Sequence, residues 1–239
     1  MGVSMAIKSR GPGEVPQHVA LIPDGNRRWS RENKLKTFNG YEVGIKKFID
    51  FSVWLKGFGV KTLTVWALSI DNISSRNGAE LSALYGLYIK AANDPDILEK
   101  LDANRSRVNI IGNLSLLPAG VRAALRKVEK RTKGYGDFTI NLLIAYGGRY
   151  DLSVAVKRIT QMGMPLDEGT IQRNLLTSSI PDADMIIRTS GEQRLSGFLP
   201  WQSAYSELYF SKKYWPDFQK QDLDRAMRDF SSRSRRFGR

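Results

Sequence analysis

The stretch HVALIPDGNRRW, residues 18 to 29, joins an apolar segment to a charged turn. The run from Val19 to Ile22 is of the kind found in strands that are covered on both faces. Asp24 then precedes a glycine, an amide and two arginines. A carboxylate beside two guanidinium groups at a strand end predicts an anion site in which a metal ion links the acid to the anion. The alternative is an ordinary β-turn with surface charges, because PDGN favours a turn by itself.

Similar apolar segments predict five strands in all, at 18–23, 60–68, 107–112, 138–146 and 185–189. Amphipathic stretches between them predict helices near 41–57, 79–99, 118–133 and 149–163. Such alternation is typical of a mainly parallel sheet with helices on both faces. The chain has no internal repeat and no composition break. We therefore predict a single α/β domain with a mainly parallel central sheet flanked by helices, after a flexible lead-in over residues 1–17.

Polar segments follow four of the predicted strands, and ligands bind at the carboxyl ends of parallel strands. These segments are PDGNRR (23–28), SIDN (69–72), AYGGR (145–149) and RTSGEQR (188–194). Their glycines allow the backbone to approach an anion, and their arginines can grip phosphate oxygens in pairs. The chain has no G-x-x-x-x-G-K-[ST] motif, so a P-loop for nucleoside triphosphates is not supported. The four segments together predict a diphosphate site that uses magnesium.

The composition of the 239-residue chain limits the chemistry further. It contains no cysteine, which excludes disulfides, thiol nucleophiles and zinc sites built on thiolates, and which fits a reducing cytoplasm. The one histidine, His18, opens a predicted strand, and we interpret it as structural. No segment approaches the roughly 20 consecutive apolar residues of a membrane span.

The net charge is +13, which favours a polyanionic partner such as nucleic acid, an anionic membrane or a phosphorylated substrate. The arginines concentrate at strand ends and do not form an alternating aromatic and basic surface, so we predict no nucleic-acid partner. The terminal Arg233, Arg235 and Arg236 could draw the protein to the inner face of an anionic membrane as a peripheral protein.

Taken together, the segments resemble the cis-prenyltransferases, which include undecaprenyl diphosphate synthase. The motifs that carry this resemblance are HVALIPDGNRRW (18–29), WALSIDN (66–72), INLLIAYGGRYDL (140–152), DADMIIRTSGEQRLSGFLPWQSAYSELYF (182–210), WPDF (215–218) and RRFG (235–238). The resemblance implies a catalytic domain over residues 18–239. It also implies a homodimeric or heterodimeric enzyme that extends an allylic prenyl diphosphate with isopentenyl diphosphate and forms cis double bonds.

The same resemblance implies roles for single residues. Asp24 would be the magnesium-linked carboxylate, and Glu207 would be a second metal-associated acid that reaches across the dimer. Asn72 falls where the family assigns proton removal; because an amide is a poor base, we interpret it as a positioning residue and a diphosphate oxygen as the proton acceptor. The substrate-binding candidates are Gly25, Asn26, Arg27, Arg28, Trp29, Thr37, Tyr41, Ser69, Ile70, Asp71, Ile73, Arg76, Arg188, Arg194, Leu195 and Ser196.

A tunnel for the growing prenyl tail is a further expectation. Leu81, Leu84, Tyr85 and Tyr88 repeat at helical spacing and predict a tunnel-lining helix, with plain core packing as the alternative. If either tyrosine faces the tunnel, the product would be shorter than that of a long-chain synthase.

Several positions depart from the family pattern. Tyr41 stands where histidine is common and Thr37 where arginine is common; Asp71 replaces a glutamate, Ile73 replaces an aromatic residue, and Arg76 is displaced by one residue. Because these changes surround the phosphate loop and the proton-removal motif, irregular coupling with dimethylallyl diphosphate stays open beside ordinary cis elongation. An inactive partner subunit is a third alternative, which the retained aspartate and arginines disfavour.

Overall fold

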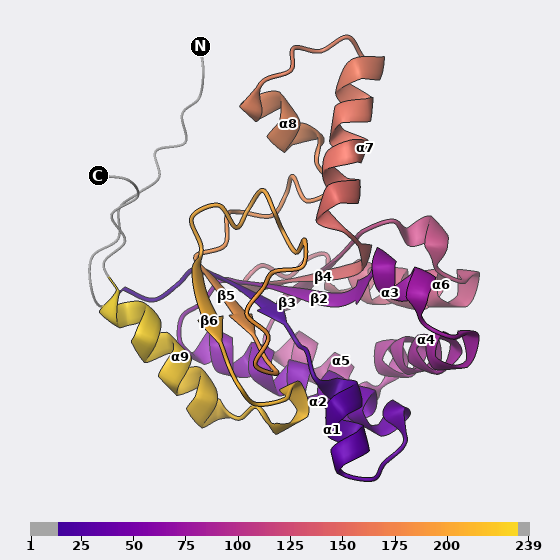
Figure 1. Ribbon diagram of the computed structural model, residues 1–239, viewed down its shortest axis with the longest axis vertical. Coiled ribbons are helices and arrows are strands. Elements are labelled where there is room, and N and C mark those ends of the chain that lie inside the picture. Colours follow the sequence, from indigo (N-terminus) through magenta and orange to yellow (C-terminus); the bar gives the residue numbers. More distant parts are fainter. Residues whose placement is uncertain (1–13, 234–239) are drawn as a thin grey trace.

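The computed structural model describes residues 14–233, and its centre is a six-stranded sheet (Figure 1). The strands are β1 (His18–Ile22), β2 (Thr62–Ser69), β3 (Ser106–Ile111), β4 (Phe138–Tyr146), β5 (Met185–Arg188) and β6 (Glu207–Phe210). Every neighbouring pair is parallel, and the spatial order is β3-β4-β2-β1-β5-β6. β1 therefore has β2 on one side and β5 on the other, and the strand order reverses direction beside β1. Parallel sheets bind ligands at such a switch point.

The helices are α1 (Asn26–Glu32), α2 (Thr37–Gly57), α3 (Ile70–Ser75), α4 (Gly78–Asn93), α5 (Pro95–Ala103), α6 (Ala119–Thr132), α7 (Gly148–Gln161), α8 (Glu168–Asn174) and α9 (Lys220–Ser232). Short 3-10 helices lie at η1 (Leu114–Leu116) and η2 (Trp215–Asp217). None of the helices within residues 14–233 is long and apolar enough to cross a membrane.

The larger hydrophobic core lies on one face of the sheet. It joins strand residues such as Leu21, Leu63 and Ile140 to apolar residues of α2, α4, α5, α6 and α9. On the opposite face, Ala20, Leu143 and Ile186 belong to a smaller cluster that also contains Ile180, Ala183, Phe198 and Leu199 from the segments around β5. Strand residues therefore alternate between two buried faces, which is why the strands read as continuous apolar runs.

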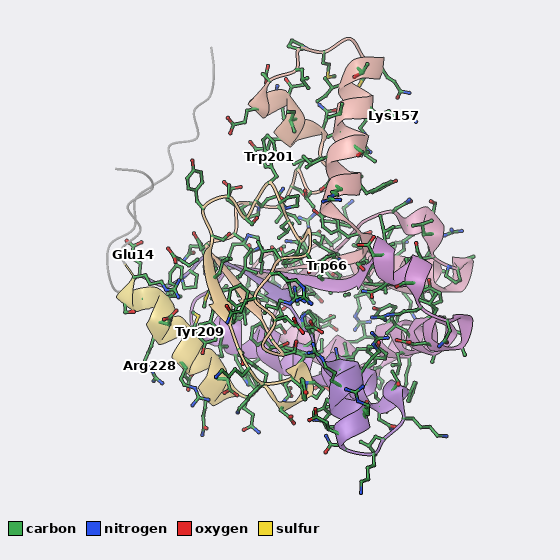
Figure 2. The ribbon with its side chains drawn as sticks, in the orientation of Figure 1. Glu14, Trp66, Lys157, Trp201, Tyr209 and Arg228 are labelled. Carbon is green, nitrogen blue, oxygen red and sulfur yellow. The ribbon has the colours of Figure 1, made fainter. Side chains whose placement is uncertain are left out.

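The opposite face is covered by irregular chain more than by helices. Trp66, in the middle of the molecule in Figure 2, stacks on Phe198 with ring centroids 5.3 Å apart. Helices α7 and α8 project away from the sheet at the top of Figure 1, and Lys157 on α7 points outward in Figure 2. The predicted parallel sheet flanked by helices is confirmed, with this difference in how the second face is covered.

The predicted elements differ from the structure at several places, and α3, α8 and α9 were not predicted as helices. All five predicted strands are present, but β6 was missed, and α1 occupies residues read only as a turn. The predicted helix over 79–99 is two helices, because Pro95 begins α5 and the Asp94 side chain caps it by accepting from the N–H groups of Asp96 and Ile97. Residues 1–13 of the predicted lead-in lie outside the described part, whereas the Gln17 carbonyl accepts hydrogen bonds from the N–H groups of Lys61 and Thr62.

His18 belongs to a buried line of polar side chains that crosses four strands. Its Nδ1 lies 2.9 Å from the carbonyl oxygen of Pro181 and must donate, so Nε2, 2.8 Å from the Thr64 hydroxyl, accepts. Thr64 in turn accepts from Asn141, whose side-chain oxygen accepts from Asn109. Burial lowers the pKa of His18 from 6.5 to about 4, so the ring is neutral at pH 7, as this assignment of Nε2 as an acceptor requires.

This burial predicts a pH-dependent stability. The folded state binds the imidazole proton less readily than the unfolded state, so the contribution of His18 is fully present above pH 6.5 and is lost as the pH falls toward 4. The loss amounts to roughly 3 kcal/mol. Because the chain has one histidine, a single imidazole NMR signal should titrate with a pKa of about 4. Titration near 6.5 in the folded protein would contradict this assignment.

Candidate active site

One cavity of about 700 Å³ opens at the carboxyl ends of β1, β2 and β5. Its polar rim contains residues from the loops after these three strands, and its interior runs along the sheet face that carries the larger core. Thirteen of the predicted site residues line it: Asp24, Gly25, Asn26, Arg27, Arg28, Tyr41, Ser69, Asp71, Asn72, Arg76, Arg188, Arg194 and Ser196. Residues separated by up to about 170 positions in the sequence thus share one rim, as the parallel-sheet rule predicts.

Asp24 lies between β1 and α1, where its carboxylate is surrounded by cations. Its Oδ2 accepts from Nη2 of the buried Arg188 at 2.9 Å, and its Oδ1 accepts from the Gly25 N–H at 2.7 Å and lies 3.4 Å from Arg28 Nη2. Burial raises the pKa of Asp24, but the hydrogen bond and charge of Arg188, with Arg28 and the Gly25 N–H, outweigh it and hold the pKa below its usual range. Asp24 is therefore ionised at neutral pH.

A second acid, Glu192, joins two of the rim arginines. Its two carboxylate oxygens lie 2.9 Å from Arg28 Nη1 and 2.5 Å from Arg194 Nη1. Arg188 donates through Nη1 to the Ser196 hydroxyl at 3.0 Å and to the Arg194 carbonyl. The loops after β1 and β5 are thereby tied into one cationic surface, with guanidinium groups arranged to receive an anion.

The loop after β2 contributes polar groups at the start of a short helix. The Ser69 hydroxyl accepts from the backbone N–H of Asn72 at 2.9 Å and caps α3. This cap places Asp71 and Asn72 at the rim, where both line the cavity. Arg76 follows at the end of α3, and its guanidinium lies 5.3 Å from the centre of the Tyr41 ring.

The loop after β4 does not line the cavity, and the prediction that AYGGR contributes to the anion site is wrong in that respect. Gly148 packs so closely on the next loop that a Cβ would lie 2.2 Å from Pro200 Cδ, and its N–H donates to the Gly197 carbonyl at 3.0 Å. This segment therefore supports the loop that carries Arg194 and Ser196 without touching the ligand space.

Six other predicted site residues also lie away from the cavity lining: Trp29, Thr37, Ile70, Ile73, Leu195 and Glu207. The Trp29 indole donates to Asp217 at 2.7 Å, so it fixes α1 to η2. Glu207 lies on the edge strand β6 and pairs with Arg233 at 2.7 Å. The cavity of one chain therefore contains Asp24 but not Glu207.

The interior of the cavity is apolar. It is lined by Ile45 and Phe48 of α2, by Leu84, Tyr88 and Ala91 of α4, by Ile97 and Leu101 of α5, by Leu125 and Val128 of α6, and by strand residues including Val108, Ile110 and Ile140. Of the predicted stripe, Leu84 and Tyr88 face this space, whereas Tyr85 packs against the core. The Tyr88 hydroxyl donates to the Ala67 carbonyl at 2.8 Å, so its polar end is satisfied.

Four residues at or beside the rim were missed by the sequence analysis. Arg31 and Trp215 line the cavity, and Glu80 and Glu192 hold its arginines. Arg31 lies one helical turn after Arg27 and Arg28 on α1, a signal that depends on recognising α1 as a helix. For Glu192, the signal was its place within RTSGEQR between two arginines.

The donor set of the rim fits a magnesium ion held mainly by its substrate. No group of three or more metal-binding side chains occurs within residues 14–233. Mg²⁺ is commonly bound by one or two carboxylates, with substrate oxygens and water completing its octahedron. Asp24, ionised and partly exposed at the cavity, is a carboxylate that fits this arrangement.

Comparison with known proteins agrees with this site. Residues 22–238 match the family model described as "Putative undecaprenyl diphosphate synthase". The chain is 44% identical over 234 residues to a tritrans,polycis-undecaprenyl-diphosphate synthase (geranylgeranyl-diphosphate specific) from Methanopyrus kandleri, covering 95% of this chain and 86% of the relative. It is 40% identical over 241 residues to an isoprenyl transferase from Thermus thermophilus, covering 96% and 90%.

A solved structure shows the same fold at lower sequence identity. The crystal structure of lavandulyl diphosphate synthase from Lavandula x intermedia, in complex with dimethylallyl diphosphate, superposes with a TM-score of 0.89 at 32% identity, covering 94% of this chain and 99% of that one. The match of the family model over nearly the whole chain and the identity to curated relatives lead to one conclusion. The chain belongs to the undecaprenyl diphosphate synthase family of cis-prenyltransferases.

Proposed function

We propose that this prenyltransferase extends geranylgeranyl diphosphate with isopentenyl diphosphate and forms a cis-polyprenyl diphosphate. The observation that carries the proposal is the continuity of one cavity, which has a cationic rim and an apolar interior. Such a shape fits a molecule with a diphosphate head and a hydrocarbon tail. The relative from Methanopyrus kandleri, described as specific for geranylgeranyl diphosphate, supports the choice of primer.

The rim residues would stabilise the charge that develops when the allylic diphosphate ionises. Arg27 and Arg28, with the N-terminal N–H groups of α1, would hold the leaving diphosphate, since preorganised donors are most effective where charge develops. Arg188, Arg194 and Ser196 would bind the diphosphate of isopentenyl diphosphate, because Arg188 ends β5 and donates to the Ser196 hydroxyl and to the Arg194 carbonyl in the following loop. Asn72 would position the condensing unit, and a diphosphate oxygen would accept the proton.

Magnesium, when bound, would neutralise diphosphate oxygens and assist departure of the leaving group. Asp24 would hold the ion, because its carboxylate is ionised and lies at the rim of the cavity. Glu207 would contribute only from a partner chain, since it lies on the edge strand β6 and does not line the cavity of its own chain. We therefore propose a homodimer in which β6 lies near the partner, with a heteromer as the alternative.

The cavity volume of about 700 Å³ is within the usual range of sites that bury a small-molecule ligand. Its interior is lined by apolar residues of α2, α4, α5 and α6, which would enclose the prenyl tail. An apolar wall also excludes water, which would quench the allylic cation.

Filling the tunnel should shorten the product. Ala91 lines the cavity from α4, and Ala91→Phe would place a phenyl ring in the path of the tail. We expect the main product to lose at least one isoprene unit, while the rate of the first condensation changes by less than about threefold. Mass spectrometry of dephosphorylated products measures this. Ala103→Phe, at an exposed site at the end of α5, should leave the product length unchanged.

Irregular coupling is the second candidate, and the lavandulyl diphosphate synthase structure favours it specifically. The TM-score of 0.89 shows that this chain and a lavandulyl diphosphate synthase have the same fold, so the fold is compatible with either type of coupling. Of the altered residues, Tyr41 and Asp71 line the cavity, whereas Thr37 and Ile73 do not. Ordinary elongation is the first proposal because the relatives at 44% and 40% identity are described as an undecaprenyl-diphosphate synthase and an isoprenyl transferase.

The decisive experiment supplies purified protein and magnesium with labelled geranylgeranyl diphosphate and either isopentenyl or dimethylallyl diphosphate. A ladder of cis products with isopentenyl diphosphate alone would support elongation. A single branched adduct with dimethylallyl diphosphate would replace the proposal by irregular coupling. No product in either case, with folded protein, would favour a non-catalytic partner subunit.

Because the proposed product is a lipid that has to reach a membrane, we also propose that the protein associates peripherally with a membrane surface. Of the terminal arginines named above, Arg235 and Arg236 lie outside the described residues, and Arg233 pairs with Glu207 and Asp229. Binding to vesicles that increases with their anionic lipid content would support this proposal. Equal binding to neutral vesicles would contradict it.

A further inference from the structure

Glu80 is an acid that meets the cationic rim although no sequence motif gave it a role. It lies in the first turn of α4, where its N–H donates to the Asn77 side chain at 2.8 Å. The N-terminal N–H groups of a helix stabilise negative charge at this position. The Glu80 side chain is only 14% exposed, so its carboxylate needs partners within the protein.

Three side chains surround this carboxylate. The Tyr41 hydroxyl donates to Oε1 at 2.7 Å, Arg76 Nε lies 3.5 Å from Oε1, and Arg27 Nη1 lies 3.7 Å from Oε2. Burial raises the pKa of Tyr41, so its hydroxyl keeps its proton and acts as a donor. Tyr41, Arg27 and Arg76 all line the cavity.

The two ion pairs are looser than the hydrogen bond from Tyr41. Both distances exceed the 2.7–2.9 Å or so of a direct charge-assisted hydrogen bond. Arg76 Nε is buried and makes no hydrogen bond with any residue that the structure describes. A buried donor without an acceptor is unfavourable, so Arg76 would gain by turning to an anion in the cavity.

We propose that Glu80 is a displaceable internal anion that competes with diphosphate for Arg27 and Arg76 and thereby promotes release of the diphosphate product. Tyr41 positions the Glu80 carboxylate through its hydrogen bond. It donates to Glu80 whether or not the arginines are present, so the carboxylate stays satisfied after they have turned to the substrate. The inference rests on the proposed function only for the identity of the anion.

The competition fixes the direction of each effect. Replacing Glu80 by glutamine removes the competing charge, so diphosphate should bind more tightly and leave more slowly. Replacing Tyr41 by phenylalanine leaves Glu80 with the arginines as its remaining partners, so it should hold them more firmly and weaken diphosphate binding. Without the Glu80 charge, the Tyr41 hydroxyl has no carboxylate to satisfy, and its removal should have little further effect.

The test is calorimetric binding of inorganic pyrophosphate, with magnesium, to the full chain. For Glu80→Gln we expect a Kd about tenfold lower, and under saturating substrates a kcat several-fold lower with a burst of first turnover. For Tyr41→Phe we expect a Kd about threefold higher. In the double variant, Tyr41→Phe should change the Kd by less than about 1.5-fold relative to Glu80→Gln.

Two matched variants serve as controls. Tyr85→Phe removes a phenol hydroxyl from α4, the helix that carries Glu80. Glu99→Gln removes an exposed carboxylate from α5. Both should bind pyrophosphate as the wild type does. Thermal unfolding establishes that each variant is folded.

Failure of the inference differs from failure of the proposed function. Unchanged or weaker pyrophosphate binding by Glu80→Gln, or an equal effect of Tyr41→Phe with and without the Glu80 charge, would overturn the inference and leave the diphosphate site intact. A wild-type protein that binds neither pyrophosphate nor geranylgeranyl diphosphate would remove the proposed substrate class, and the inference with it.

Discussion

Asp24→Asn should lower kcat by about a thousandfold, since removing one preorganised electrostatic group from an active site typically costs a hundred- to a thousandfold. The amide keeps the shape of the side chain but loses the charge that would hold magnesium. It also leaves Arg188, a buried guanidinium, without its anionic partner at 2.9 Å. Steady-state kinetics with geranylgeranyl and isopentenyl diphosphates at saturating magnesium measure the effect.

The loss of the buried ion pair should also appear in stability. Leaving a buried charge unpaired costs several kcal/mol. We therefore expect a lower Tm for Asp24→Asn, together with a partial recovery of Tm when pyrophosphate supplies a substitute anion for Arg188. Glu99→Gln removes an exposed carboxylate outside the cavity and should change neither kcat nor Tm. Activity within tenfold of wild type in Asp24→Asn would contradict the proposed metal role.

The fold was largely predictable because its strands are covered on both faces. Five strands read as continuous apolar runs, and strand–helix alternation then required a parallel sheet. β6 was missed because Glu207–Phe210 is a short edge strand of four half-buried residues, with only three consecutive apolar residues. α1 was missed because it begins directly after Gly25, whose φ of 103° is a turn conformation.

The rim of the site was predictable, but its internal charge pairing was not. The parallel-sheet rule brings the loops after β1, β2 and β5 together without any contact being known. The pairs themselves join residues far apart in sequence: Arg28 and Glu192 are separated by 164 positions. Spacing contains no information on such long-range pairs, so the contacts of Glu192 with Arg28 and of Glu80 with Arg27 were missed, and AYGGR was wrongly assigned to the rim.

Gly40→Ala should weaken both stability and catalysis, because a Cβ at this position would lie 2.2 Å from the backbone oxygen of Asn26. Gly40 lies in α2 where that helix crosses α1, and its N–H donates to the Ser30 hydroxyl at 2.9 Å. Backbone cannot move aside as a flexible side chain can, so α1 must shift away from α2. Overpacking of this kind costs about 1–3 kcal/mol.

The shift should reach the rim, because α1 carries Arg27, Arg28 and Arg31. A displacement of about 1 Å in such groups can lower the rate by about a hundredfold. We therefore expect Gly40→Ala to raise the KM for the allylic diphosphate and lower kcat, with a lower Tm. Gly86→Ala is the matched control: it lies exposed in α4 with no atom within 4 Å of the added methyl group, so it should keep full activity and stabilise the helix by about 0.5–1 kcal/mol. If Gly40→Ala lowers Tm but leaves the kinetics of the allylic substrate unchanged, α1 does not position the diphosphate.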